Sequence, residues 1–253
     1  MATTTVTTTT SIAGLSVRVV DAAAGQASGP APPPVVVLLH GFSMTADDLA
    51  PFGASLGVPA LFLFPEGPID LAPHGLRGRA WWMIDVDRRD AAIARGDDRD
   101  LGDENPAGLP AANQRLATLL GEVRARWPGR ALFLGGFSQG AILSLDLVLR
   151  NRPALPALSS LAGLILLSSG RVTAAAWAAL MQGDNARGLP MFQSHGRLDR
   201  ELSFAAAAAL AADLAAAGAR HTFVAFDGAH ELPLPVLRAL KRFLRDHQGA
   251  TGQ

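Results

Sequence analysis

The chain has no cysteine among its 253 residues. This excludes disulfides, a thiolate nucleophile and cysteine-bound metal, and it leaves the redox compartment open. An excess of charge of either sign is also missing, because 22 lysines and arginines balance 22 aspartates and glutamates. Without a basic field, neither nucleic acid nor an anionic membrane surface is an expected partner.

Long hydrophobic runs are missing as well. The longest weakly apolar stretch, 203–219, is mostly alanine, contains Asp213 and closes at Gly218, as is typical of a helix in a soluble protein. The threonine-rich residues 1–15 lack the basic start and the apolar run of a secretory signal, so they predict a disordered lead-in and a cytoplasmic protein. We therefore expect no stable insertion into a membrane.

Apolar residues make up 49% of the chain, which over residues 16–250 is enough for a single domain with a buried core. Continuous apolar runs predict buried strands, and amphipathic stretches between them predict helices. Strands are expected at 16–21, 35–39, 60–64, 131–134, 161–167, 189–194 and 221–226, with a glycine- and proline-rich loop at 22–34. Helices are expected at about 45–56, 110–127, 139–150, 174 onward, 203–219 and 235 onward.

This alternation predicts the α/β class, with a mostly parallel central sheet covered by helices on both faces and ligands bound at the carboxyl ends of the strands. Two helix starts carry cap residues, since Thr45-Ala-Asp-Asp48 resembles a capping box and Thr173 precedes the helix at 174. Between Ile69 and Gly108 periodicity fails. We expect the charged part of that segment, 88–104, to be a solvated surface loop.

A glycine-flanked serine lies at the centre of this pattern. Residues 136–140 read Gly-Phe-Ser-Gln-Gly, directly after a buried strand and directly before a helix that stops ahead of Pro153. The order of strand, sharp turn and helix is that of a nucleophile elbow, in which the serine, here Ser138, exposes its hydroxyl above the carboxyl edge of a sheet. The flanking glycines are required because a side chain there would collide with a neighbouring strand or helix.

A serine hydroxyl needs a neutral imidazole as base and a carboxylate that orients the imidazole. In this fold the acid and then the histidine follow the serine, each at the end of a strand. Four of the six histidines are excluded, because two precede the serine, one begins a strand and one lies in the last helix: His40, His74, His221 and His247. We pair Asp199 with His230, assign His195 to holding the Asp199 turn, and keep Asp227 as the competing acid.

The tetrahedral intermediate of acyl transfer needs two hydrogen-bond donors for its oxyanion. The backbone N–H groups of Gln139, after the serine, and Phe42, after an early central strand, are the candidates. Gly41 favours the second donor because a residue without Cβ lets the backbone approach a substrate. The candidate substrate-binding side chains are apolar, as such pockets mostly are, and core packing is an equally good interpretation of each: Phe42, Trp81, Trp82 and Met83.

Five motifs therefore occur together: His40-Gly41-Phe42, Trp81-Trp82 with Asp85, Gly136-Phe-Ser-Gln-Gly140, His195-Gly-Arg-Leu-Asp199 and Gly228-Ala-His230. In this combination the chain, from about Val35 to the C-terminal helix, resembles the phospholipase/carboxylesterase family of α/β-hydrolases, which includes the acyl-protein thioesterases. The resemblance implies the α/β-hydrolase fold and a cofactor-free serine carboxylesterase that forms an acyl-Ser138 intermediate.

The chain departs from the family pattern in two places. The His-Gly pair is usually followed by a glycine and an acidic residue, whereas Phe42-Ser-Met-Thr45 follows here. The charged segment between Asp85 and Pro110 looks bacterial in type and argues against a lipid-modified protein as the substrate.

Three functions remain open on this pattern. The first is cleavage of carboxylic esters or thioesters, the second is lysophospholipase or acyl-protein thioesterase activity, and the third is a catalytically silent binding protein on the same fold. No metal cluster, phosphate loop or dinucleotide fingerprint accompanies the motifs, so we expect no cofactor and no metal site. The expected partner is a small-molecule ester or thioester, and a homodimer is compatible with the sequence.

Overall fold

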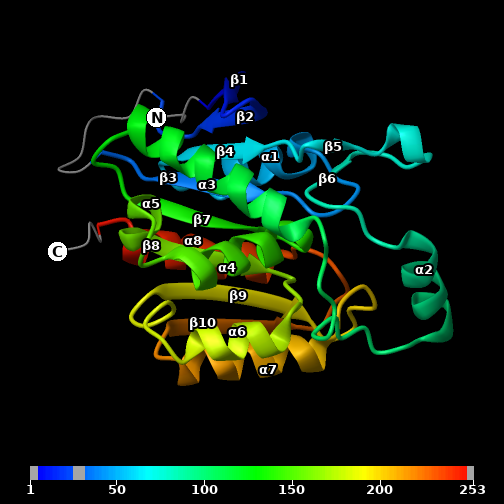
Figure 1. Ribbon diagram of the computed structural model, residues 1–253. Coiled ribbons are helices and arrows are strands. Elements are labelled where there is room, and N and C mark those ends of the chain that lie inside the picture. The colour runs from blue at the N-terminus through cyan, green and yellow to red at the C-terminus, as the bar shows by residue number, and fades with distance from the viewer. Residues whose placement is uncertain (1–4, 25–31, 250–253) are drawn as a thin grey trace.

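The structure, a computed structural model, describes residues 5–24 and 32–249 (Figure 1). Eight strands form its central sheet: β1 (Val6–Ile12), β2 (Leu15–Asp21), β3 (Val35–Leu39), β4 (Leu61–Pro65), β7 (Leu132–Phe137), β8 (Leu161–Leu167), β9 (Pro190–Gly196) and β10 (Arg220–Phe226). Their order is β1-β2-β4-β3-β7-β8-β9-β10. From β4 to β10 all neighbours are parallel, and only the pairings of β2 with β1 and with β4 are antiparallel. The predicted mostly parallel sheet is confirmed.

Helices cover both faces of this sheet, as predicted (Figure 1). They are α1 (Ala46–Ser55), α2 (Val86–Arg95), α3 (Leu109–Arg126), α4 (Gln139–Asn151), α5 (Pro156–Ser159), α6 (Ala174–Met181), α7 (Phe204–Ala216) and α8 (Leu234–His247). Alternate side chains of β3 enter two separate cores: Val35 and Val37 join that of α3, α4, α6 and α7, whereas Val36 joins that of α1 and α8. Among the helices of the described residues, none is long and apolar enough to cross a membrane.

The N-terminal prediction is wrong over most of its described part. Val6–Ile12 is not a disordered lead-in but the edge strand β1, paired antiparallel with β2. Ala13 and Gly14, with φ of 51° and 73°, make the two-residue turn between the strands. Residues 1–4, residues 25–31 of the predicted loop 22–34, and residue 250 lie outside the described residues.

The two predicted helix caps differ in outcome. Asp48 Oδ2 accepts a hydrogen bond from the backbone N–H of Thr45 at 2.7 Å, as a capping box requires. Thr173 precedes α6 in a left-handed conformation, with φ of 44°, and its side chain makes no capping bond. The Thr173 cap is therefore a wrong prediction, although the helix begins at Ala174 as expected.

The segment 69–108 is more ordered than its sequence predicts. It contains a small sheet of β5 (Ile69–Asp70) and β6 (Arg79–Ala80), the 3-10 turn η1 (Ala72–His74), and the helix α2. Asp85 caps α2 by accepting from Arg88 N–H at 2.9 Å. Within the charged run 88–104, the predicted surface loop is thus partly a helix, and Figure 1 shows that α2 stands apart from the layers of the sheet. No residue of α2 is buried, and five of its ten residues are charged, which is why its sequence predicts a solvated loop.

Candidate active site

Ser138 occupies a strained turn between β7 and α4. Its backbone has φ of 54° and ψ of −118°, a region that residues with a Cβ rarely adopt. The turn is held in place because Ser138 N–H donates to the carbonyl of Leu167, at the end of the adjacent β8, at 2.9 Å. This is the backbone geometry of a nucleophile elbow, and Ser138 lines a cavity above the sheet.

The glycines of the elbow allow it to press against the end of β3. A Cβ at Gly136 would lie 2.5 Å from the carbonyl oxygen of Leu39, and a Cβ at Gly140 would overlap the same oxygen. Gly41, just after β3, lies against the serine, since a Cβ added at Gly41 would be 3.2 Å from Ser138 Cβ. The close contacts of Gly136 and Gly140 with the backbone of β3 explain why glycine is needed at both positions. These contacts also bring the loop after β3 next to Ser138.

The loops after β9 and β10 bring Asp199 and His230 into contact. His230 Nδ1 lies 2.7 Å from Asp199 Oδ2. The loops can meet because a side chain at Gly196 would overlap the carbonyl oxygens of Gly228 and Ala229. His230 lines the same cavity as Ser138, and no hydrogen bond joins the two side chains in the described part of the chain. A catalytic hydrogen bond is often long in an empty site and shortens when substrate binds.

Asp199 is held in the ionised form by its surroundings. Burial works to raise the pKa of its carboxyl group, but hydrogen bonds from His195 and His230 outweigh burial and keep that pKa well below its usual range. Oδ1 also accepts backbone N–H bonds from Glu201 at 2.8 Å and Leu202 at 3.0 Å. A permanent carboxylate beside Nδ1 fixes the His230 tautomer that leaves Nε2 free to accept a proton.

His195 and Asp227, the neighbours considered from sequence, have different environments. His195 is fully buried, and its Nε2 lies 3.2 Å from Asp199 Oδ2 and 3.2 Å from Leu202 O, where it contacts both ends of the Asp199 turn. Asp227 is 92% exposed and lies 3.4 Å from Arg197, so it does not take the place of Asp199 beside His230.

The two oxyanion candidates are backbone N–H groups that border the cavity. Gln139 is the first residue of α4, where N–H groups lack an intrahelical acceptor, and within residues 32–249 Phe42 N–H has no acceptor. Buried His40 accepts from Gly67 N–H at Nε2 and therefore donates from Nδ1 to Gly41 O at 2.7 Å. Because the Gly41–Phe42 peptide is planar and trans, this turns the Phe42 N–H the opposite way.

The imidazole of His40 is neutral in this position. Burial lowers its pKa to about 4, since the surrounding core disfavours the charged ring. A neutral ring is what the two contacts require, because one nitrogen must donate and the other must accept. His40 therefore acts as a fixed support below the loop that carries Phe42.

The predicted substrate-binding side chains separate into two groups. Phe42 and Trp82 line the cavity, whereas Trp81 and Met83 do not, and their assignment is corrected. The Trp81 indole turns into the core because its N–H finds the carbonyl of His40 at 2.9 Å, and Met83 is 41% exposed to solvent. The Gln139 side chain fixes this segment by accepting a hydrogen bond from the backbone N–H of Trp81 and donating one to the backbone carbonyl of Trp82, both at 2.9 Å.

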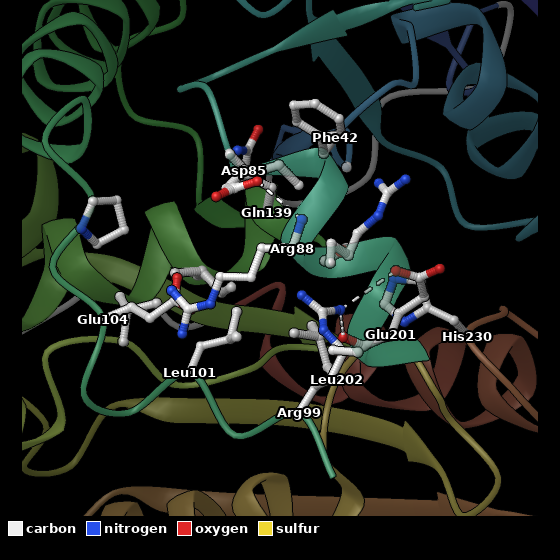
Figure 2. A pocket seen from close by; sticks show the side chains of 18 of the residues that line it. Phe42, Asp85, Arg88, Arg99, Leu101, Glu104, Gln139, Glu201, Leu202 and His230 are labelled. Carbon is white, nitrogen blue, oxygen red and sulfur yellow. Dashed lines mark hydrogen bonds and ion pairs between the residues drawn. The ribbon is translucent and has the colours of Figure 1, made fainter. Parts of the chain in front are cut away.

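The cavity holds about 570 Å³ and has two kinds of wall. Part of the lining is apolar and is called here the apolar wall: Trp82, Leu101, Phe137, Ile142, Val172 and Leu202. Of these, Phe137 precedes Ser138 in the chain and Ile142 lies one turn into the helix that follows it. The lining also contains charged side chains from α2 and the residues after it, called here the charged wall, which the sequence prediction missed: Arg88, Arg89, Arg95, Asp97, Asp98, Arg99 and Glu104. Figure 2 labels Arg88, Arg99 and Glu104 among them. In the sequence, these residues are marked only by their position in a long segment between two core elements, where functional loops often occur.

Metal-ligating groups are not assembled in residues 5–24 and 32–249, where no cluster of three or more histidine, aspartate or glutamate side chains could hold an ion. The arrangement offers instead a serine, an imidazole, a buried carboxylate and two backbone donors. These are the groups that acyl transfer through a serine requires.

A model of the phospholipase/carboxylesterase family matches residues 22–248. Among solved structures, esterase PE8 has 24% identity and a TM-score of 0.66, covering 86% of this chain and 94% of its own. Acyl-protein thioesterase 2 of Zea mays has 19% identity and a TM-score of 0.68, covering 92% and 99%. A carboxylesterase of Mesorhizobium loti has 17% identity and a TM-score of 0.67, covering 95% and 98%. No curated protein sequence matches significantly, and at these identities the structural likeness shows the fold.

Proposed function

The chain belongs to the phospholipase/carboxylesterase family of α/β-hydrolases, and on that premise we propose that it is a serine hydrolase of carboxylic esters or thioesters. The observation that carries the proposal is the contact of 2.7 Å between His230 Nδ1 and Asp199 Oδ2, at a cavity that Ser138 also lines. A strained serine beside an oriented histidine is costly to maintain and has no use in a silent binding protein.

In the proposed reaction, Ser138 Oγ attacks the carbonyl carbon of the substrate while His230 Nε2 takes the hydroxyl proton. The carbonyl oxygen becomes an oxyanion that accepts hydrogen bonds from the N–H groups of Phe42 and Gln139. His230 then gives the proton to the departing alcohol or thiol, which leaves acyl-Ser138. Water, activated by His230, attacks the acyl carbon and regenerates the serine, while Asp199 stabilises the imidazolium in both steps.

The cavity walls favour a short or medium acyl chain. The apolar wall, which includes Phe137 and Ile142 next to Ser138 in the chain, would suit the acyl group, whereas a long chain would also have to cover the charged wall and desolvate it at a free-energy cost. The leaving group would face the charged wall, so a polar alcohol or thiol fits better than a lipid. This argues against lysophospholipids and long-chain acyl proteins as the preferred substrates.

The test is hydrolysis of chromogenic acyl esters of increasing chain length, with fluorophosphonate labelling, by wild type, Ser138→Ala and the surface control Ser55→Ala. We expect wild type and control to label and to prefer short or medium chains, and Ser138→Ala to lose both properties. Wild type that neither labels nor hydrolyses any ester would overturn the proposal and favour a binding protein.

A further inference from the structure

One arginine of the charged wall is buried against the turn that carries Asp199. The Arg99 side chain is only 11% exposed, although it belongs to the run expected to be a solvated loop. Its guanidinium Nη1 donates to the backbone carbonyl of Glu201 and lies 3.6 Å from the Glu201 carboxylate. Its own carbonyl accepts from Ser203 N–H at 3.0 Å, so side chain and backbone both hold the same turn. Figure 2 shows the Arg99 guanidinium directed at Glu201.

The turn that Arg99 holds is the one that orients the carboxylate of Asp199. The N–H groups of Glu201 and Leu202 both donate to Asp199 Oδ1, and Leu202 O faces His195 Nε2. The Arg99 guanidinium therefore binds the backbone carbonyl of Glu201, while the backbone N–H of Glu201 donates a hydrogen bond to the carboxylate of Asp199. A shift of this backbone would move Asp199 Oδ2 relative to His230.

We propose that Arg99 is a positioning residue for Asp199, through which the segment after α2 keeps the acid aligned with His230. The inference rests on the proposed function, because its kinetic consequence requires that His230 be the base. Other arginines on this wall have different partners: Arg88 lies 3.5 Å from Glu104, and Arg95 lies 2.6 Å from Asp97. Arg99 alone of these three reaches the Asp199 turn within the described chain. The charged wall thus supports catalysis as well as enclosing the cavity.

The proposal is tested with Arg99→Met and Arg99→Lys, alongside Arg152→Met. Arg152 is a matched control because it also grips backbone carbonyls, those of Asn185 and Arg187 at 3.1 and 3.0 Å, away from the cavity. We expect Arg99→Met to lower kcat by about 10- to 100-fold with little change in KM, as small misplacements of catalytic groups do. Arg99→Lys should recover part of kcat, and Arg152→Met should lose stability but keep kcat.

A second readout does not depend on turnover. The proton between His230 Nδ1 and Asp199 gives a downfield ¹H resonance, which should move or broaden in Arg99→Met and stay unchanged in Arg152→Met. If the resonance moves in Arg99→Met but the wild-type protein hydrolyses no ester, the proposed function is refuted and the positioning role is retained. An unchanged resonance with kcat within twofold of wild type, or a loss confined to KM, would overturn the inference.

Discussion

The floor of the cavity and its cap are built in opposite ways. The floor is defined here as the elbow at Ser138 together with the loops after β3, β9 and β10, and the cap as residues 85–104 including α2. The floor rests on β3, β7 and β9, which are buried along their whole length, on the partly buried β10, and on glycines that touch neighbouring backbone. The cap has a helix without a buried residue, held partly by exposed ion pairs.

The floor and the cap therefore differ in how firmly they hold their side chains. Groups that must stay within fractions of an ångström are placed on the floor, where packing allows one arrangement. The exposed ion pairs of the cap contribute little stability, so the charged side chains of the cap are held less firmly than the groups of the floor. Arg99 is where the two regions meet, because it is a cap residue that holds a turn of the floor.

The largest effect is expected from Asp199→Asn, which attacks the chemistry of the floor. Asparagine keeps the size of the side chain but removes the charge and favours the wrong tautomer of His230. We expect kcat to fall about 10⁴-fold. Steady-state kinetics with a short-chain ester, together with a thermal unfolding curve that shows the variant is folded, would check this. Activity within tenfold of wild type would mean that another group orients His230.

The next effect is expected at the elbow, where Gly140→Ala places a Cβ on the carbonyl of Leu39. Backbone must move to accept it, and we expect a loss of about 3 kcal/mol or more in the free energy of unfolding. Gly121→Ala is the control, because Gly121 lies inside α3 with no atom within 4 Å of the added Cβ. That variant should gain about 1 kcal/mol. Denaturant titration measures both, and equal changes would refute the packing argument.

The floor should also respond to pH through His40. The folded-state pKa of His40 is about 4 against an ordinary value of 6.5, so in this window the unfolded chain binds a proton that the folded chain does not. Stability is therefore complete above about pH 6.5 and falls as the pH is lowered towards 4, by roughly 3 kcal/mol for His40. His221, with its pKa also lowered to about 4 by burial, acts in the same direction.

Unfolding measured from pH 7 to 4 checks this, with His40→Asn as the comparison. The variant should show a shallower decline, because the asparagine side chain does not titrate. An identical pH dependence in the two proteins would show that folding does not lower the pKa of His40.

The smallest effect is expected from the cap itself. Arg88→Gln removes an exposed ion pair, since the side chains of Arg88 and Glu104 are 72% and 41% exposed. The free energy of unfolding should change by no more than about 0.5 kcal/mol. KM should change by a few-fold while kcat stays the same, because the side chain borders the cavity but not the reacting atoms. A large loss of stability would show that the cap is as tightly packed as the floor.

The floor is the part of the molecule that the sequence predicts best. Continuous apolar runs predict its strands because buried strands must be apolar on both faces. The spacing of Gly136, Ser138 and Gly140 predicts the elbow, and chain order favours Asp199 as the partner of His230 while leaving Asp227 as the alternative. The structure shows that these two side chains, Asp199 and His230, meet, and the catalytic roles remain predictions.

The cap and the edge of the sheet are predicted poorly, for physical reasons. The helix α2 buries no residue and half of its residues are charged, so its sequence resembles that of a solvated loop. Trp81 and Trp82 are adjacent, alike and both buried, and the hydrogen bond from the Trp81 indole to the distant carbonyl of His40 distinguishes Trp81 from Trp82, which lines the cavity. The threonines of β1 have the composition of a polar linker, and their strand depends on pairing with β2. Each of these features depends on long-range contacts.

The central claim, that His230 activates Ser138 as a nucleophile, is tested most directly by mass spectrometry after reaction with a fluorophosphonate. Wild type should carry one adduct per chain, on the peptide that contains Ser138, and His230→Ala should form it far more slowly at the same inhibitor concentration. An adduct on another serine, or equal rates in the two proteins, would contradict the account.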